Sequence, residues 1–163
     1  MFAYNIFPSS RGVSVAKRLT GCFFLCILIS CSSFNAKAPE NFAAYNENEG
    51  DTFRAISSDG VLYRVSAYKQ KSEASMDFWK EAFSLNMRNL NYKQEDSLNV
   101  SISGKAAMGY IFSFANSTGQ DLYLVAAVPN GNKMLVVEAS AEREKFNARK
   151  ADILKAIGEI KLH

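Results

Sequence analysis

Three long apolar segments in the second half of the chain constrain its fold more than any other feature. They span residues 106–115, 121–128 and 133–139. The first two are separated by Asn116-Ser117-Thr118-Gly119, and the last two by Pro129-Asn130-Gly131-Asn132. Asn-Gly between apolar runs is the strongest short-range signal for a β-hairpin. The sequence therefore predicts an antiparallel meander of three strands.

The faces of these strands show what must pack around them. In an antiparallel sheet with one wet face, apolar and polar residues alternate along each strand. In the segment 106–115 both faces are apolar. One face carries Met108, Tyr110, Phe112 and Phe114, and the other carries Ala107, Ile111 and Ala115. We therefore expect other elements to cover both faces of the sheet.

Two amphipathic helices are predicted to provide these covers. The first begins after Ser75, a good N-cap residue, and continues to Asn89. The second extends from Glu142 to Ile157, with Gly158 as its expected C-cap. The first helix is expected to bury Phe78, Trp79, Ala82, Phe83, Leu85 and Leu90, and the second Phe146, Ile153, Leu154 and Ile157. The predicted fold class is α+β, an antiparallel sheet meander sandwiched between two helices.

Shorter strands complete the predicted domain. Thr52–Ile56 and Val61–Tyr68 flank a turn that ends in Asp-Gly, which indicates a hairpin. A further short strand is expected at Leu98–Ile102. Ile160 and Leu162 are expected to add a closing strand. The predicted globular domain thus covers residues 52–163.

The order of these elements resembles a known family. A strand hairpin comes first, then a helix carrying Phe78-Trp79, then a meander opening with Gly109-Tyr110-Ile111-Phe112-Ser113-Phe114, and last a helix from Phe146 to Ile157. This pattern, over residues 52–162, resembles the PsbP-like fold of photosystem II extrinsic proteins, Ran-binding Mog proteins and bacterial lipoproteins of the DcrB type. The resemblance implies a non-enzymatic accessory or assembly domain, and no residue of the Ran-binding or photosystem roles can be carried over.

The N-terminal segment has the features of an export signal. Lys17-Arg18 precedes an apolar run, Leu19–Ile29, and the segment ends in Leu28-Ile29-Ser30-Cys31. These last four residues match the bacterial lipobox, which predicts removal of residues 1–30 and lipidation of Cys31. An uncleaved membrane anchor is a poorer reading, because a spanning helix needs about 20 apolar residues. Ordinary cleavage without lipid leaves Cys31 unexplained.

The same reading gives a location. The protein is expected to be anchored to a membrane by its lipid and to face the periplasm, and Ser32 favours the outer membrane over the inner one. The segment before Lys17 is long for such a signal, so translation could instead begin at Val13 or Val15. Residues 31–51 are polar and are predicted to form a lipidated, flexible tether, with Phe42 and Tyr45 touching the domain.

Charge and cysteine content limit the possible functions. Arg11, Lys17 and Arg18 are three of the 19 basic residues, so 16 basic residues remain beyond the leader against 16 acidic ones. This balance excludes the basic footprint of a nucleic-acid-binding protein. All three cysteines lie at or before residue 31, so the domain is expected to fold without disulfides.

No constellation of catalytic residues is present. The single histidine, His163, is the last residue, which argues against Ser-His-Asp triads and multi-histidine zinc sites. Ser66-Ala67-Tyr68-Lys69 matches a penicillin-binding signature, but on a strand its Ser and Lys point to opposite faces. Glu95-Asp96 and the pair Glu47 and Glu49 are interpreted as solvated loop charges. We therefore predict no catalytic, cofactor or metal site.

Glu138 is the one acid within a strongly apolar strand, Met134–Ala139. We interpret it as an edge position or strand end facing water, with a polar anchor for a partner or ligand as the alternative.

Two functional hypotheses follow. The first is a membrane-anchored, non-enzymatic interaction or assembly domain of the bacterial cell envelope, with an envelope protein as its partner. The alternative is binding of a small apolar or lipid ligand between a helix and the sheet. It is motivated by an excess of aromatic residues: Tyr63, Phe78, Trp79, Phe83, Tyr110, Phe112, Phe114 and Tyr123. A pocket lined by these side chains would favour the alternative.

Overall fold

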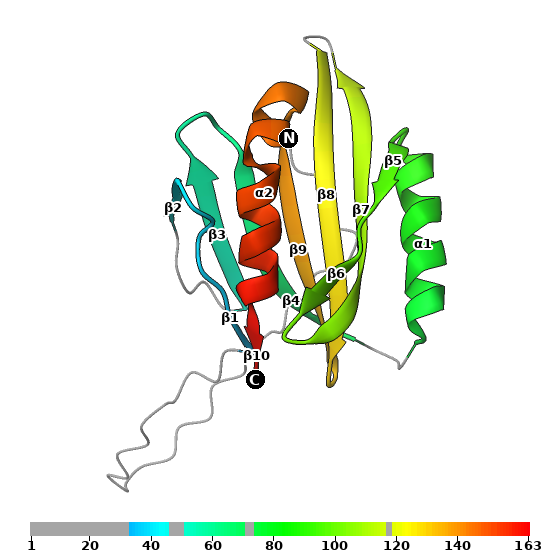
Figure 1. Ribbon diagram of the computed structural model, residues 1–163. Coiled ribbons are helices and arrows are strands. Elements are labelled where there is room, and N and C mark those ends of the chain that lie inside the picture. The colour runs from blue at the N-terminus through cyan, green and yellow to red at the C-terminus, as the bar shows by residue number, and fades with distance from the viewer. Residues whose placement is uncertain (1–32, 46–50, 71–73, 117–118) are drawn as a thin grey trace, which may run out of the picture. The chain divides into compact units, whose positions relative to one another are not determined.

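An eight-stranded antiparallel sheet forms the framework of the domain (Figure 1). The computed structural model describes residues 33–45, 51–70, 74–116 and 119–163. The strands run in the order β2-β3-β4-β9-β8-β7-β5, and β6 also pairs with β7. Their bounds are β2 Phe42–Ala44, β3 Thr52–Ser57, β4 Leu62–Lys69, β5 Lys93–Ser97, β6 Val100–Ile102, β7 Lys105–Asn116, β8 Gly119–Asn130 and β9 Lys133–Glu142.

The predicted meander is confirmed. β7 pairs with β8 and β8 with β9, and the second hairpin closes at the pair Asn130 and Lys133. Gly131 in this turn has a φ of 59°, a conformation that glycine adopts without strain. The predicted first hairpin, β3–β4, is also present. It is joined to the meander by pairing of β4 with β9, from Leu62 opposite Ser140 to Lys69 opposite Lys133.

Helix α2, Arg143–Glu159, covers one face of the sheet (Figure 1). Its residues Phe146, Ile153 and Ile157 are fully buried. They belong to the main hydrophobic core, which includes Leu124 and Val137 from the central strands. The predicted end of this helix is wrong, because the helix continues through Gly158 and its C-cap is Ile160.

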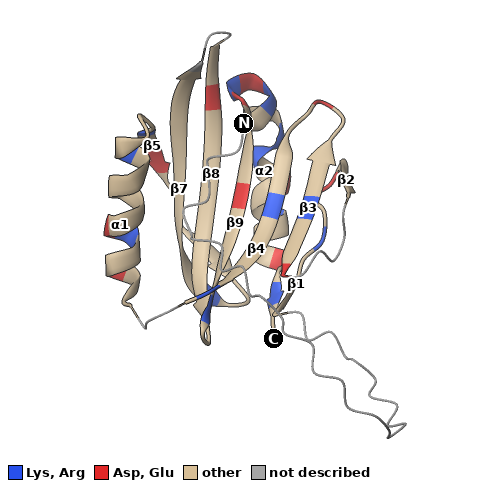
Figure 2. Cartoon of the chain, turned by 180° about the vertical axis from the view of Figure 1, so that it is seen from behind, with Lys and Arg blue, Asp and Glu red and all other residues tan. Residues whose placement is uncertain are grey.

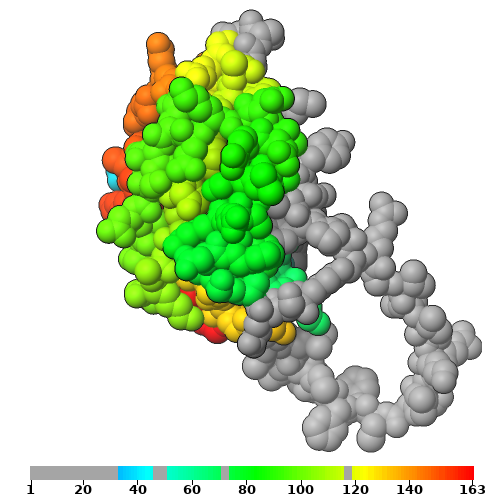
Figure 3. Space-filling view, turned by 90° about the vertical axis from the view of Figure 1, so that its right-hand side faces the viewer, coloured from blue at the N-terminus to red at the C-terminus, as the bar shows by residue number. Residues whose placement is uncertain are grey.

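Helix α1, Met76–Asn89, lies on the opposite face and begins as predicted. The Ser75 hydroxyl accepts a hydrogen bond from the Phe78 backbone N–H at 3.2 Å. The helix buries Phe83 and Met87, and the Phe83 ring packs against Phe112 with 5.7 Å between ring centroids. Figure 3 shows α1 as an outer layer beside the strands β5 to β7.

The predicted apolar stripe of α1 is partly wrong. Phe78 is 54% exposed, Leu85 51% and Leu90 42%. Because α1 lies along the β5–β7 margin of the sheet, only a narrow strip of the helix faces inward. The α+β class with two helices and a large antiparallel sheet is confirmed, but the sandwich is uneven. On the face that α1 shares, no helix within the described ranges lies over β3 and β4 (Figure 2).

The predicted start of the domain at Thr52 is also wrong. Residues 33–45, interpreted as tether, contribute two strands: β1, Phe34–Asn35, pairs with β10, Lys161–Leu162, and β2 pairs with β3. The Phe34 side chain is 5% exposed. The Tyr45 backbone N–H donates to the Arg54 carbonyl at 3.0 Å. These short strands escaped prediction because two or three residues are too few to show an alternation. The predicted closing strand is confirmed as β10.

The strand predicted at Leu98–Ile102 is shorter than expected and has an unpredicted neighbour. β6 begins at Val100, and β5 precedes it at the edge of the sheet. All five residues of β5, Lys93–Ser97, are exposed, so this strand carries no apolar pattern that could have revealed it. Charged side chains on an edge strand oppose pairing with other chains.

Candidate functional site

The predicted signal peptide and the lipidation residue Cys31 lie outside the residues that the structure describes, as do Glu47, Glu49 and Ser32. Within the described ranges, no helix has the length and apolar character required to span a membrane. Cys31 therefore stays a prediction from sequence.

A charged network lies on the sheet face that α1 covers only in part. Glu138 on β9 accepts a hydrogen bond from the Arg64 guanidinium of β4 at 2.6 Å, and the two groups form an ion pair. The Tyr123 hydroxyl of β8 donates to the other carboxylate oxygen at 2.5 Å. Figure 2 shows the acidic position on β9 beside a basic one on β4. Our interpretation of Glu138 as an edge position facing water is wrong, because β9 is a central strand and Glu138 is 6% exposed.

The network has clear electrostatic consequences. Burial raises the pKa of Tyr123 well above its ordinary value, and the neighbouring Glu138 carboxylate raises it further. Burial alone would lower the pKa of Arg64, but the charge and hydrogen bond of Glu138 outweigh it and raise that pKa. Both oxygens of Glu138 are engaged by these partners. The arrangement therefore fits a fixed polar anchor within the sheet better than an acid or base that exchanges protons with a substrate.

The remaining ionisable residues singled out from the sequence do not converge. Ser66 is buried and Lys69 is exposed, as expected for opposite faces of a strand. Glu95 and Asp96 lie on β5 rather than in a loop. Glu95 pairs with Arg143 at 2.6 Å and Asp96 with Lys150 at 3.5 Å, both across to α2. Within the described ranges, no group of three or more His, Cys, Asp or Glu side chains is placed to hold a metal ion.

The aromatic residues pack largely against one another. Tyr63 forms edge-on contacts with Phe42 and Phe53, at 6.5 and 6.4 Å between ring centroids. The ring centroid of Tyr92 lies 5.1 Å from that of Phe114 and 5.9 Å from that of Tyr123. Each of these rings thus has another ring as its neighbour.

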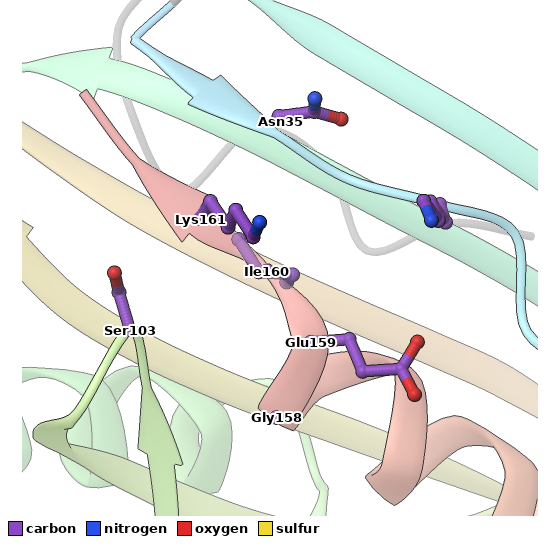
Figure 4. Close-up of a pocket in the computed structure, with 7 residues that line it drawn as sticks. Asn35, Ser103, Gly158, Glu159, Ile160 and Lys161 are labelled. Carbon is purple, nitrogen blue, oxygen red and sulfur yellow. The ribbon is translucent and has the colours of Figure 1, made fainter.

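A pocket of about 650 Å³ opens where the end of α2 meets β1 and the β6–β7 turn (Figure 4). None of the aromatic residues proposed from the sequence lines it. Its lining residues come from three separated segments of the chain: Asn35, Lys37, Ser103, Gly158, Glu159, Ile160 and Lys161. Sequence reasoning missed this pocket, since Asn35 and Lys37 were assigned to the tether and nothing in the pattern links them to Ser103.

The walls of this pocket carry charges of both signs. Lys37 and Lys161 bring two positive charges and Glu159 one negative charge, and all three residues are exposed. Asn35 lies opposite Lys161 in the β1–β10 pair. The last turn of α2 contains no basic residue, so the negative end of its dipole adds to the charge of Glu159. The lining thus carries two positive charges and one negative charge, with the negative end of the α2 dipole beside them.

Comparisons with known proteins identify the fold. The cyanobacterial PsbP of Synechocystis sp. PCC 6803 matches with a TM-score of 0.60 at 8% identity, over 80% of this chain and 87% of that one. LpqN of Mycobacterium tuberculosis, described as involved in cell envelope biogenesis, matches with a TM-score of 0.54 at 11% identity, over 79% and 82%. The Ran-binding protein Mog1p of Saccharomyces cerevisiae matches with a TM-score of 0.53 at 9% identity, over 80% and 90%.

These similarities confirm the fold that the sequence resemblance implied. The domain has the PsbP-like fold shared by PsbP and Mog1. No family model matches the chain. No curated protein matches it either. At these identities the likeness establishes the fold and carries no functional residue from one protein to another.

Proposed function

We propose that this protein is a lipoprotein of the bacterial cell envelope whose PsbP-like domain serves as a non-enzymatic interaction or accessory module. The sequence Leu28-Ile29-Ser30-Cys31 carries the proposal, because a small residue before a cysteine at the end of an apolar run is the pattern that lipoprotein processing requires. Lipid on Cys31 would hold the domain at the membrane, facing the periplasm, with the outer membrane favoured.

The fold supports this proposal at the level of the protein class. The similar structures include PsbP, a Ran-binding protein and an envelope-biogenesis protein. The buried cluster around Glu138 supports it as well. Glu138, Arg64 and Tyr123 bind one another, which stabilises a charged anchor but leaves no oxygen of Glu138 without a partner. An envelope protein is the expected partner.

Palmitate labelling tests the lipid anchor. Wild-type protein should incorporate labelled palmitate, accumulate as precursor in the presence of globomycin, and begin at Cys31 once processed. The Cys31→Ser variant should lose the label and remain uncleaved or leave the membrane fraction. Cys26→Ser is the matched control, since Cys26 lies in the same leader but outside the predicted cleavage site, and it should be labelled normally. Equal labelling of wild type and Cys31→Ser would refute the anchor.

Co-purification tests the interaction role. Wild-type protein cross-linked in its own membranes and solubilised should carry a second envelope protein in a fixed ratio. The complex should be lost when Cys31→Ser moves the domain away from the membrane. A protein that stays monomeric after cross-linking, or that turns over a substrate in the absence of any partner, would contradict the proposed role.

A further inference from the structure

We propose that the pocket at the end of α2 binds the headgroup of phosphatidylethanolamine, with the phosphate at Lys37 and Lys161 and the ammonium at Glu159. This inference deepens the proposed function and uses the anchor at Cys31 to place the pocket near a membrane. The pocket has about 650 Å³ of space, enough for a small headgroup.

The charges of the pocket match both ends of this headgroup. Phosphate oxygens accept hydrogen bonds from lysine ammonium groups, and charge-assisted bonds of this kind are the strong ones. Lys37 and Lys161 both line the pocket, Lys161 from β10 and Lys37 from the segment that follows β1. Asn35 and the Ser103 hydroxyl add polar groups to the lining. Figure 4 shows Ser103 reaching the pocket from a different strand pair than Lys161.

Glu159 and the end of α2 explain why the ligand should also carry a positive group. A simple anion would meet the Glu159 carboxylate and the negative end of the helix dipole, and both would repel it. An ammonium group donates hydrogen bonds to carboxylate and carbonyl oxygens, so the same features would attract it. The headgroup of phosphatidylethanolamine contains both a phosphate and an ammonium, whereas phosphatidylglycerol lacks the positive group.

The position of the pocket in the chain places it near the lipid surface. Asn35 lies four residues after Cys31, and four extended residues span at most about 14 Å. A lipidated Cys31 would sit at the boundary of the hydrocarbon layer, and the polar layer above it is roughly 5–8 Å thick. The pocket would therefore lie at, or just above, the headgroups.

Hydrogen bonds to the Ser33 carbonyl fix the segment just before β1, which leads into the pocket residues Asn35 and Lys37. The Ser33 carbonyl accepts hydrogen bonds from the His163 backbone N–H at 3.2 Å and from the Asn130 side chain at 3.1 Å. These contacts tie the start of the described chain to its C-terminus and to the β8–β9 turn.

Titration of the purified lipoprotein in detergent with soluble headgroups tests the proposal. Amide signals in nuclear magnetic resonance spectra would be followed while glycerophosphoethanolamine is added. The amide signals of Gly158, Lys161 and Ser103 should shift. The apparent Kd for glycerophosphoethanolamine should be lower than the Kd for glycerophosphocholine, glycerophosphoglycerol or inorganic phosphate. Lys37→Gln and Lys161→Gln should each weaken binding by about fivefold, the size of one partly exposed charge pair. Glu159→Gln should abolish the preference for the ethanolamine compound.

The matched control is Lys93→Gln, an exposed lysine on the distant edge strand β5, which should leave the Kd unchanged. All substituted side chains are exposed, and circular dichroism would verify that each variant is folded. The proposal is overturned if these amides do not shift, if inorganic phosphate binds as tightly, or if glycerophosphoglycerol is preferred. Because the headgroups are soluble, this result does not depend on lipidation. Palmitate labelling without headgroup binding would refute this inference alone, whereas headgroup binding without labelling would refute the anchor.

Discussion

Glu138 shows how a single residue can differ from the pattern that surrounds it. Its neighbours on β9 are apolar and buried, and its carboxylate is retained there because Arg64 and Tyr123 satisfy both oxygens. Removing one member of a buried ion pair costs about 3–5 kcal/mol, since the remaining charge loses its partner. Arg64 is 18% exposed, so water would offset part of this cost.

We predict that Glu138→Ala lowers the free energy of unfolding by about 3 kcal/mol, within the range for a broken buried pair. Tyr123→Phe should cost about 1.5 kcal/mol, because it removes one hydrogen bond to a charged group. Urea denaturation followed by fluorescence would measure both. Glu142→Gln is the control: this exposed residue forms an ion pair with Lys145, and its substitution should change the free energy of unfolding by no more than about 0.5 kcal/mol. If the substitutions at residues 138 and 142 lower the free energy of unfolding equally, the buried network does not stabilise the fold.

Among the elements, α1 shows what helical periodicity can and cannot establish. The pattern fixes where the helix begins, and the Ser75 cap is observed as expected. It does not fix which part of a wide apolar stripe is buried. That depends on where the helix packs, and α1 packs along the sheet margin with Phe83 and Met87 inward and Phe78 outward.

This position gives a prediction for paired substitutions in α1. Phe83→Ala should lower the free energy of unfolding by about 3–4 kcal/mol, as expected for a phenylalanine removed from a packed core. Phe78→Ala, the same chemical change one helix face away, should stay within about 0.5 kcal/mol because its side chain is 54% exposed. Thermal and urea unfolding of the two variants would measure both changes in the free energy of unfolding. A larger loss for Phe78 than for Phe83 would mean that α1 packs through its other face.

At the scale of the whole molecule, local signals in the sequence predicted most helices and strands, but they did not predict which distant strands pair. The β7–β8–β9 meander is encoded by turns between neighbouring segments, so it could be predicted. The pairing of β4 with β9 joins residues about 70 positions apart, and no local pattern specifies it. The pocket was missed for the same reason, because its lining residues near Asn35 and Lys161 are brought together only by the β1–β10 pair. Glu138 was noticed from its apolar neighbours, but its partner Arg64 lies across that unpredicted strand pair.

The β1–β10 pair leads to a prediction about where the stable domain begins. A chain starting at Thr52 would lose β1 and β2, leaving β10 unpaired and the Phe34 site empty. Burying a phenylalanine contributes about 2–3 kcal/mol by itself. We therefore expect the chain that starts at Thr52 to be at least about 3 kcal/mol less stable than one that starts at Ser33, measured by urea unfolding.

Two point variants of the chain that starts at Ser33 separate the causes of this loss. Phe34→Ala should reproduce much of it, because the Phe34 side chain is 5% exposed, whereas exposed Asn35→Ala should change stability by less than about 0.5 kcal/mol. Dithiothreitol should affect neither chain, since all three cysteines precede Ser33. Equal stability of the two chains would restore the interpretation of residues 33–51 as a tether. It would also remove the structural basis for a pocket held close to Cys31, since Asn35 and Lys37 would then not be fixed against β10.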